Sequence, residues 1–176
     1  MKIGLCGTMS VGKTTLVNAL QKLPQFKGYN FATERSKYLN DLGIPLNTDS
    51  TLKGQTIFLA ERCAELIQTD IITDRTVIDV MAFTMNAKSI HYQDKESFET
   101  YAAEFIREYD YIFYISPYGL DIEDNGVRET DEHYRDLIDF TITTLIKRYG
   151  HRCNVVEKIS GSTEERIQQI LNITGL

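Results

Sequence analysis

Residues 7–14 are the feature that most constrains what this chain can fold into. They read Gly-Thr-Met-Ser-Val-Gly-Lys-Thr and match the pattern G-x-x-x-x-G-K-[ST] at every fixed position. The two glycines allow backbone angles that other residues avoid, and the N–H groups of such a loop turn inward around phosphates. The pattern therefore predicts a phosphate-binding P-loop, with nucleotide contacts from Gly7, Thr8, Met9, Ser10, Val11, Gly12, Lys13, Thr14 and Thr15.

The segments on both sides of the loop agree with this prediction. Residues 2–6 are a short apolar run that suits a buried parallel strand. Residues 14–20 have Leu16, Ala19 and Leu20 on one side of a helix. A P-loop needs this order of strand, loop and helix, because the helix N-terminus adds positive potential to the phosphate site.

Two side chains of the loop carry its chemistry. Lys13 is expected to place its charge at the β- and γ-phosphates, which makes it a catalytic candidate, and the Thr14 hydroxyl is suited to binding Mg²⁺. GTPase switches of this class also need an Asn-Lys-x-Asp motif, which the corresponding residues 115–118 lack. We therefore expect ATP and Mg²⁺ as the cofactors.

Composition limits the class of protein further. The chain has 176 residues with 42% apolar side chains, so we expect a single domain over residues 1–176. It has no run of 18 apolar residues, and the first strand begins at the N-terminus, so we expect no membrane span and no signal peptide. Three scattered cysteines are typical of reduced thiols in a cytoplasmic protein. The net charge of −6 argues against a surface built to coat nucleic acid.

Strand-like runs alternate with helical patterns along the whole chain. Further strands are expected at 29–32, 70–75, 111–115 and 154–156, and further helices at 36–42, 51–68, 77–87, 95–108, 132–149 and 163–171. The alternation predicts an α/β fold of the P-loop NTPase type, a three-layer α/β/α sandwich with a five-stranded parallel sheet and a helical lid. Ligands of such sheets bind at the carboxyl ends of the strands.

Acidic and basic side chains follow two of these strand ends. Asp74 ends the third strand, where a carboxylate holds Mg²⁺ or accepts a proton from a substrate hydroxyl; the alternative is a helix N-cap. Glu34 ends the second strand and is a candidate base, or a group that orients the accepting hydroxyl. Arg35 and Arg75 are candidate contacts for the acceptor substrate, although an exposed arginine can equally form a surface ion pair of little energetic value.

Two later segments complete the candidate site. Residues 117–135 include a polar stretch with two glycines after a buried strand, which predicts a lid. Arg128 and Arg135 of this lid are candidates for neutralising charge on the phosphates, Arg128 as a catalytic residue and Arg135 as a nucleotide contact. Gly161 and Ser162 precede the last helix and are candidate contacts for the nucleobase; a simple turn with an N-cap is the alternative.

These motifs together resemble the small P-loop kinases of nucleosides and nucleotides. The chain is most similar to the AAA-type ATP-binding family that contains the ribosylnicotinamide kinase domain of the bacterial NAD-biosynthesis regulator. The similarity lies in Gly7 to Thr15, in Thr33-Glu34-Arg35 and in Asp74-Arg75-Thr76, and the lid motif is similar except that Asn125 separates Asp124 from Gly126. Thymidylate kinase, and viral kinases that phosphorylate hydroxymethyluracil in DNA, are more distant relatives by the same marks.

The resemblance implies transfer of the γ-phosphoryl of ATP to a hydroxyl or phosphate of a small nucleoside or nucleotide. It also implies that Thr14 holds Mg²⁺ directly and that Asp74 acts through a metal-bound water or as the base. A kinase whose acceptor hydroxyl lies on a modified base or an end of DNA or RNA is a second hypothesis, which the acidic net charge disfavours. A regulatory ATPase with slow hydrolysis is a third. The sequence leaves the oligomeric state, monomer or dimer, open.

Overall fold

A five-stranded parallel sheet forms the centre of the molecule. In the computed structural model of the chain, which describes residues 1–33, 35–120 and 131–176, the strand order is β2-β3-β1-β4-β5. The strands are β1 (Lys2–Cys6), β2 (Asn30–Ala32), β3 (Ile71–Asp74), β4 (Tyr111–Ile115) and β5 (Val155–Ile159). Every neighbouring pair is parallel, which confirms the predicted fold class.

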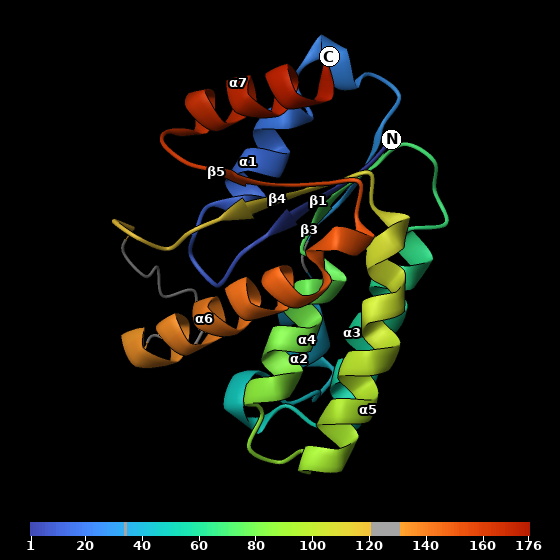
Figure 1. Cartoon of the computed structure of the whole chain (residues 1–176), viewed down its shortest axis with the longest axis vertical. Coiled ribbons are helices and arrows are strands. Elements are labelled where there is room, and N and C mark those ends of the chain that lie inside the picture. Colours follow the sequence, from blue (N-terminus) through green and yellow to red (C-terminus); the bar gives the residue numbers. More distant parts are fainter. Residues whose placement is uncertain (34, 121–130) are drawn as a thin grey trace.

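Helices cover both faces of this sheet. They are α1 (Lys13–Leu20), α2 (Ser36–Asp41), α3 (Leu52–Glu65), α4 (Val77–Asn86), α5 (Tyr92–Ala102), α6 (Glu132–Tyr149) and α7 (Thr163–Thr174). Helices α1 and α7 lie together on one face, whereas α3, α4, α5 and α6 lie on the other (Figure 1). The sandwich therefore has the three layers expected from the alternation of elements.

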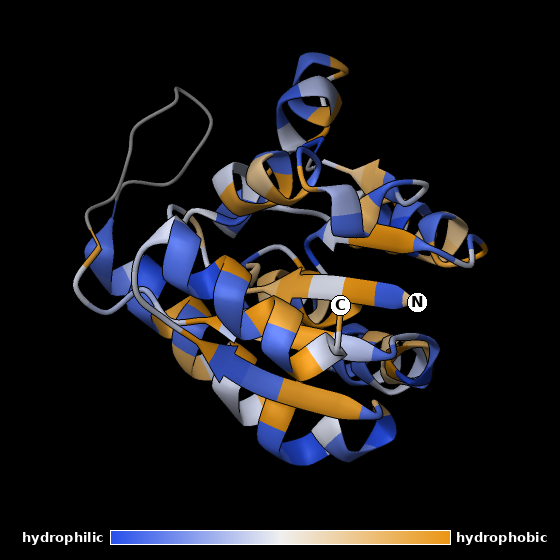
Figure 2. Cartoon of the chain, turned by 90° about the horizontal axis from the view of Figure 1, so that it is seen from above, coloured by the Kyte–Doolittle hydropathy of each residue, from blue (hydrophilic) through white to orange (hydrophobic). Residues whose placement is uncertain are grey.

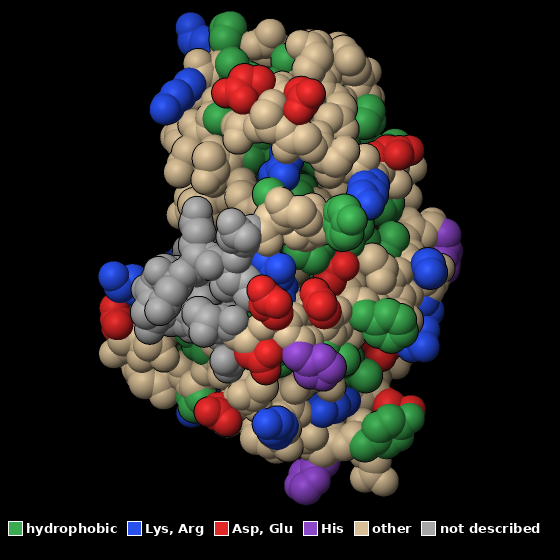
Figure 3. Space-filling view, turned by 90° about the vertical axis from the view of Figure 1, so that its left-hand side faces the viewer, with side chains coloured by type: hydrophobic (Ala, Val, Ile, Leu, Met, Phe, Trp, Pro, Cys, Tyr) green, Lys and Arg blue, Asp and Glu red, His purple; other side chains and the backbone are tan. Residues whose placement is uncertain are grey.

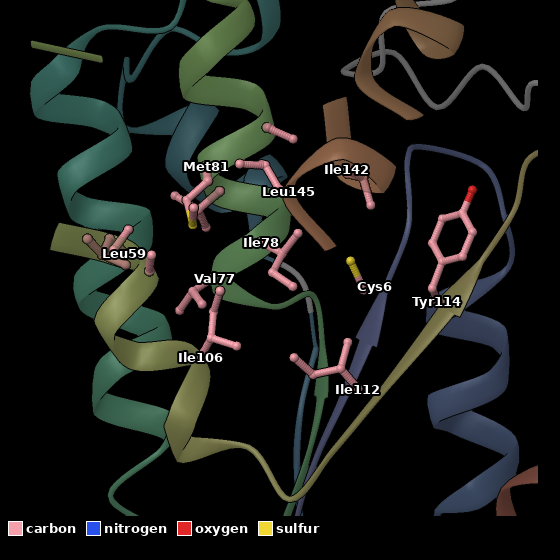
Figure 4. Packing of buried hydrophobic residues seen from close by; sticks show 14 of the residues in the cluster. Cys6, Leu59, Val77, Ile78, Met81, Ile106, Ile112, Tyr114, Ile142 and Leu145 are labelled. Carbon is pink, nitrogen blue, oxygen red and sulfur yellow. The ribbon is translucent and has the colours of Figure 1, made fainter. Parts of the chain in front are cut away.

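The three central strands, β3, β1 and β4, are largely buried between these two helical layers, whereas the edge strands β2 and β5 are partly exposed. Figure 2 shows hydrophobic residues concentrated in the strands and on the helix sides that face them. One core lies under α1 and α7 and includes Ile3, Leu5 and Phe113. The other lies under α3 to α6, where Ile78 and Met81 of α4 pack near Ile142 and Leu145 of α6 (Figure 4). Burial of this kind stabilises a domain by about 25 cal/mol per Å² of apolar surface.

Several element boundaries differ from the sequence prediction. The helix expected at 95–108 begins earlier, at Tyr92, and its second half, Ala103–Glu108, is a 3-10 helix. The last strand covers Val155–Ile159 instead of 154–156, because Glu157 and Lys158 lie in this edge strand with their side chains exposed. The final helix continues past Leu171 to Thr174 and ends at Gly175, which adopts a left-handed conformation.

All three cysteines of the chain are unpaired, and no described helix could span a membrane. Cys6, Cys63 and Cys153 are free cysteines, and burial raises the pKa of each thiol. Among the helices of residues 1–33, 35–120 and 131–176, none is long and apolar enough to cross a membrane.

Gly4 in β1 provides a test of the packing on the α3–α6 face. A Cβ atom at Gly4 would lie 2.5 Å from Thr76 Cγ2 and 2.8 Å from the ring of Tyr109. Gly4→Ala should therefore destabilise the fold by about 1–3 kcal/mol, the usual cost of overpacking a core. Gly150→Ala is the matched control, because its Cβ would meet no atom closer than 3.5 Å. Urea unfolding of both variants measures the difference, and equal stabilities would contradict this packing.

Candidate nucleotide-binding site

The P-loop connects β1 to α1 at the carboxyl edge of the sheet. Gly7 has φ 155°, and a Cβ atom there would lie 2.6 Å from the carbonyl oxygen of Ile115. Gly12 has φ 82°, a conformation that favours glycine, and α1 begins at the next residue, Lys13. The sequence motif therefore has glycine where the backbone of this loop requires it.

Lys13 lies inside the loop rather than on the surface. Its side chain is only 6% exposed, and its ammonium donates hydrogen bonds of 2.7 Å to the carbonyls of Gly7 and Thr8. Burial lowers the pKa of Lys13 and the positive charge of Arg75 lowers it further, whereas Asp79 and Asp74 act in the opposite direction. The lysine is thus held as a buried cation whose position is set by the loop's own carbonyl groups.

Thr14 of α1 and Asp74 of β3 are in contact. Asp74 ends β3, which pairs with β1 so that Asp74 lies opposite Leu5, and the Thr14 hydroxyl donates a hydrogen bond to Asp74 Oδ2. Asp74 is buried, and within the described part of the chain its other oxygen, Oδ1, has no hydrogen-bond partner. A hydroxyl beside a carboxylate with a free oxygen is the donor set that Mg²⁺ prefers.

One cavity joins these groups to the last helix. It has a volume of about 370 Å³, within the range of about 300–1,000 Å³ typical of ligand pockets. Its walls include predicted site residues from the P-loop, from the end of β3 and from the turn before α7: Met9, Ser10, Val11, Gly12, Lys13, Thr14, Thr15, Asp74, Arg75, Gly161 and Ser162. Leu120, Thr163 and Arg166 complete it. The structure therefore brings the predicted loop, the third strand end and the turn before α7 into one site.

Other predicted site residues lie outside this cavity. Arg35 is 50% exposed, stacks on Tyr38 and forms a 3.3 Å ion pair with Glu61, which is the surface pairing considered as its alternative. Arg135 is buried and donates 2.7 Å to the carbonyl of Leu120. That contact ties α6 to Leu120, near the start of the predicted lid. Glu34 and Arg128, and most of the predicted lid at residues 121–130, lie outside the described residues.

Arg75 shows backbone strain at the strand end. It has φ 129°, a value that a residue with a side chain rarely adopts, and it directly follows Asp74. Its guanidinium lies 5.0 Å from the centre of the Phe83 ring. Strained residues of this kind cluster at functional sites, where the surrounding structure holds them in place.

Two buried charged residues that touch the loop were not predicted from the sequence. Arg166 of α7 is 7% exposed and donates 2.7 Å to the carbonyl of Val11. Asp79 of α4 accepts a hydrogen bond of 3.0 Å from the backbone N–H of Gly7. No sequence pattern marks Arg166, but Thr76 and Asp79 have the spacing of a capping box, and the box is present in the structure.

One family of known proteins matches most of this chain. Residues 2–166 match the protein family described as AAA domain. A search of curated proteins found no match.

Three similar solved structures share the fold at low sequence identity. A deoxyadenosine kinase from M. mycoides with bound dCTP is 20% identical, covers 99% of both chains and has a TM-score of 0.68. The NadR protein in complex with NR is 18% identical with a TM-score of 0.76, and the match spans 99% of this chain and 51% of NadR. YorR from Bacillus subtilis, in complex with phosphorylated GDP, is 14% identical over 99% of this chain and 95% of its own, with a TM-score of 0.56.

Arg166 allows a test of the cavity wall. Arg166→Met keeps the length of the side chain but leaves the Val11 carbonyl without its donor, so ATP should bind about tenfold more weakly, the usual effect of one unsatisfied buried group. Arg107→Met removes a surface arginine paired with Glu104 and serves as the control. Calorimetric titration of both variants with ATP measures the effect, and equal affinities would show that Arg166 does not shape the site.

The chain belongs to the AAA domain family, and it shares its fold with the deoxyadenosine kinase and with NadR.

Proposed function

We propose that this chain transfers the γ-phosphoryl group of ATP to a hydroxyl or phosphate of a small nucleoside or nucleotide. The observation that carries the proposal is that one cavity is lined both by Lys13, Thr14, Asp74 and Arg75 and by the turn at Gly161 and Ser162. A nucleotide laid along this cavity would have its phosphates in the P-loop and its base near that turn. The shared fold with deoxyadenosine kinase and NadR supports the same assignment.

Mg²⁺ fits the groups present. Thr14 and Asp74 would hold it, because their oxygens already meet and Asp74 Oδ1 is buried without a partner among the described residues. When bound, the ion would neutralise charge on the β- and γ-phosphate oxygens.

The protein side chains would position and stabilise the transferred group. Lys13 would leave the carbonyls of Gly7 and Thr8 and bring its charge to the γ-phosphoryl group as negative charge develops on the leaving oxygen. The bond from the γ-phosphorus to the bridging oxygen breaks, giving ADP, while a new bond forms to the acceptor oxygen. For a hydroxyl acceptor, the proton passes to a carboxylate, for which Asp74 and Glu34 are the candidates.

The acceptor is proposed to be a small molecule rather than a nucleic acid. Figure 3 views the face toward which the carboxyl ends of the strands point, and acidic and basic side chains are interspersed over its coloured part. A groove that tracks a nucleic-acid backbone is instead lined by basic side chains. The net charge of −6 points in the same direction.

A phosphate-transfer screen with labelled ATP tests this function and identifies the acceptor. It should include nucleosides, nucleoside monophosphates, nicotinamide riboside and DNA with hydroxymethylated bases. Label transferred to a nucleoside or nucleotide supports the proposal. Label transferred only to DNA would support the nucleic-acid alternative, and phosphate released without any acceptor would support the regulatory ATPase.

Lys13→Ala is the control for the screen. We expect transfer to fall by about 10²-fold or more, because removing one preorganised charge from a developing oxyanion costs that much. The fold should survive, since the hydrogen bonds of the Lys13 ammonium go to carbonyls of its own loop. Turnover and thermal melting should be measured on the same sample. A variant that melts normally and keeps its turnover would contradict the role of the P-loop lysine.

A further inference from the structure

Asp79 is a fully buried carboxylate in the first turn of α4. Its exposed fraction is 0%, and both of its oxygens accept hydrogen bonds. Oδ1 accepts from the backbone N–H of Gly7 at 3.0 Å. Oδ2 accepts from the backbone N–H of Thr76 at 2.7 Å and from its hydroxyl at 2.8 Å. A buried charge is costly unless it is saturated in this way, so the site is built around the carboxylate.

These donors belong to two different motifs of the candidate site. Gly7 is the first residue of the P-loop and follows β1, whereas Thr76 lies two residues after Asp74 at the end of β3. The two strands are neighbours, with Leu5 opposite Asp74. The carboxylate of Asp79 therefore bonds to the residue that follows β1 and to a residue just after β3. The first belongs to the phosphate loop, and the second lies two residues from Asp74.

Helix capping alone does not require this arrangement. The box at the start of α7 makes the same reciprocal bonds between Ser162 and Glu165, yet Glu165 is exposed. Asp79 differs because it is buried and because it accepts from a further residue, Gly7, 72 residues away in the sequence. This bond directs the N–H of Gly7 toward Asp79.

We propose that Asp79 is a positioning residue that fixes the P-loop relative to Asp74, and so sets the distance between the donor phosphates and the carboxylate beside the acceptor. This inference rests on the proposed function, because the distance between the phosphates and Asp74 matters only if the chain transfers a phosphoryl group. Asp79 forms its hydrogen bonds with Gly7 and Thr76 and does not line the cavity.

Asp79→Asn tests the link with little change in shape. An asparagine has one acceptor oxygen, which cannot serve the Gly7 N–H on one side and the Thr76 N–H on the other. We expect the Kd for ATP to rise about tenfold, the effect of one buried donor left unsatisfied. Turnover at saturating ATP should fall by about 10²-fold, because displacement of reacting groups by about 1 Å has that effect.

Glu99→Gln is the matched control. Glu99 is also a buried carboxylate between two elements, and it accepts hydrogen bonds of 2.6 Å from Arg148 and 2.8 Å from Tyr149. It lies between α5 and α6, outside the site, so this variant should melt earlier with unchanged Kd and turnover. If Asp79→Asn likewise only melts earlier, Asp79 is a structural residue and the inference is wrong.

The Kd for ATP and the turnover together separate this inference from the proposed function. The Kd for ATP needs no transfer, so a wild-type chain that binds ATP without phosphorylating any acceptor would disprove the kinase assignment, and the Kd of Asp79→Asn would still decide the role of Asp79. A wild-type chain that does not bind ATP would overturn both.

A measurement on the wild-type chain covers the case in which Asp79→Asn does not fold. Hydrogen exchange by NMR should show the Gly7 amide strongly protected without ATP and unchanged when ATP is added, because Asp79 already accepts its hydrogen. Fast exchange of Gly7 without ATP, followed by protection when ATP binds, would mean that the amide serves the phosphates, and would overturn the inference.

Discussion

The contact between Thr14 and Asp74 is the interaction on which the candidate site depends. It joins the first residues of α1 to the end of β3 and places a hydroxyl against a buried carboxylate at the carboxyl edge of the sheet. The parallel pairing of β1 with β3 makes this meeting possible, because parallel strands bring their carboxyl ends to the same edge. The pairing thus brings the P-loop and the acidic strand end, which are 60 residues apart, within hydrogen-bond distance.

Buried charge is concentrated around this contact. Lys13, Asp74, Asp79 and Arg166 are each at most 7% exposed, although charged residues rarely occupy a protein interior. Each has a defined partner in the loop or at the strand end, so the charges are already gathered at the site before any ligand binds. Charges held close to the reacting groups are what phosphoryl transfer needs, because its catalysis depends mostly on position and electrostatic stabilisation.

The sequence was sufficient for the fold and for the motifs with local signatures. The P-loop, the buried strands and the long helices could be predicted because each has its own spacing of apolar, glycine and capping residues. Arg166 and the bond from Asp79 to Gly7 could not be predicted, because each contact joins segments far apart in the chain. The contact of Arg135 with the Leu120 carbonyl could not be predicted either, because helical spacing alone does not determine which groups a buried side chain meets, and the role of Arg135 as a nucleotide contact stays a prediction.

The magnesium dependence of ATP binding tests the central claim most directly. In the wild-type chain, Mg²⁺ should strengthen ATP binding, because Thr14 and Asp74 would hold the ion beside the phosphates. In Asp74→Asn most of that gain should disappear, while the affinity for ATP measured in EDTA stays close to the wild-type value. An equal gain from Mg²⁺ in both proteins, measured by calorimetric titration, would contradict the assignment of Thr14 and Asp74 as the metal-binding pair.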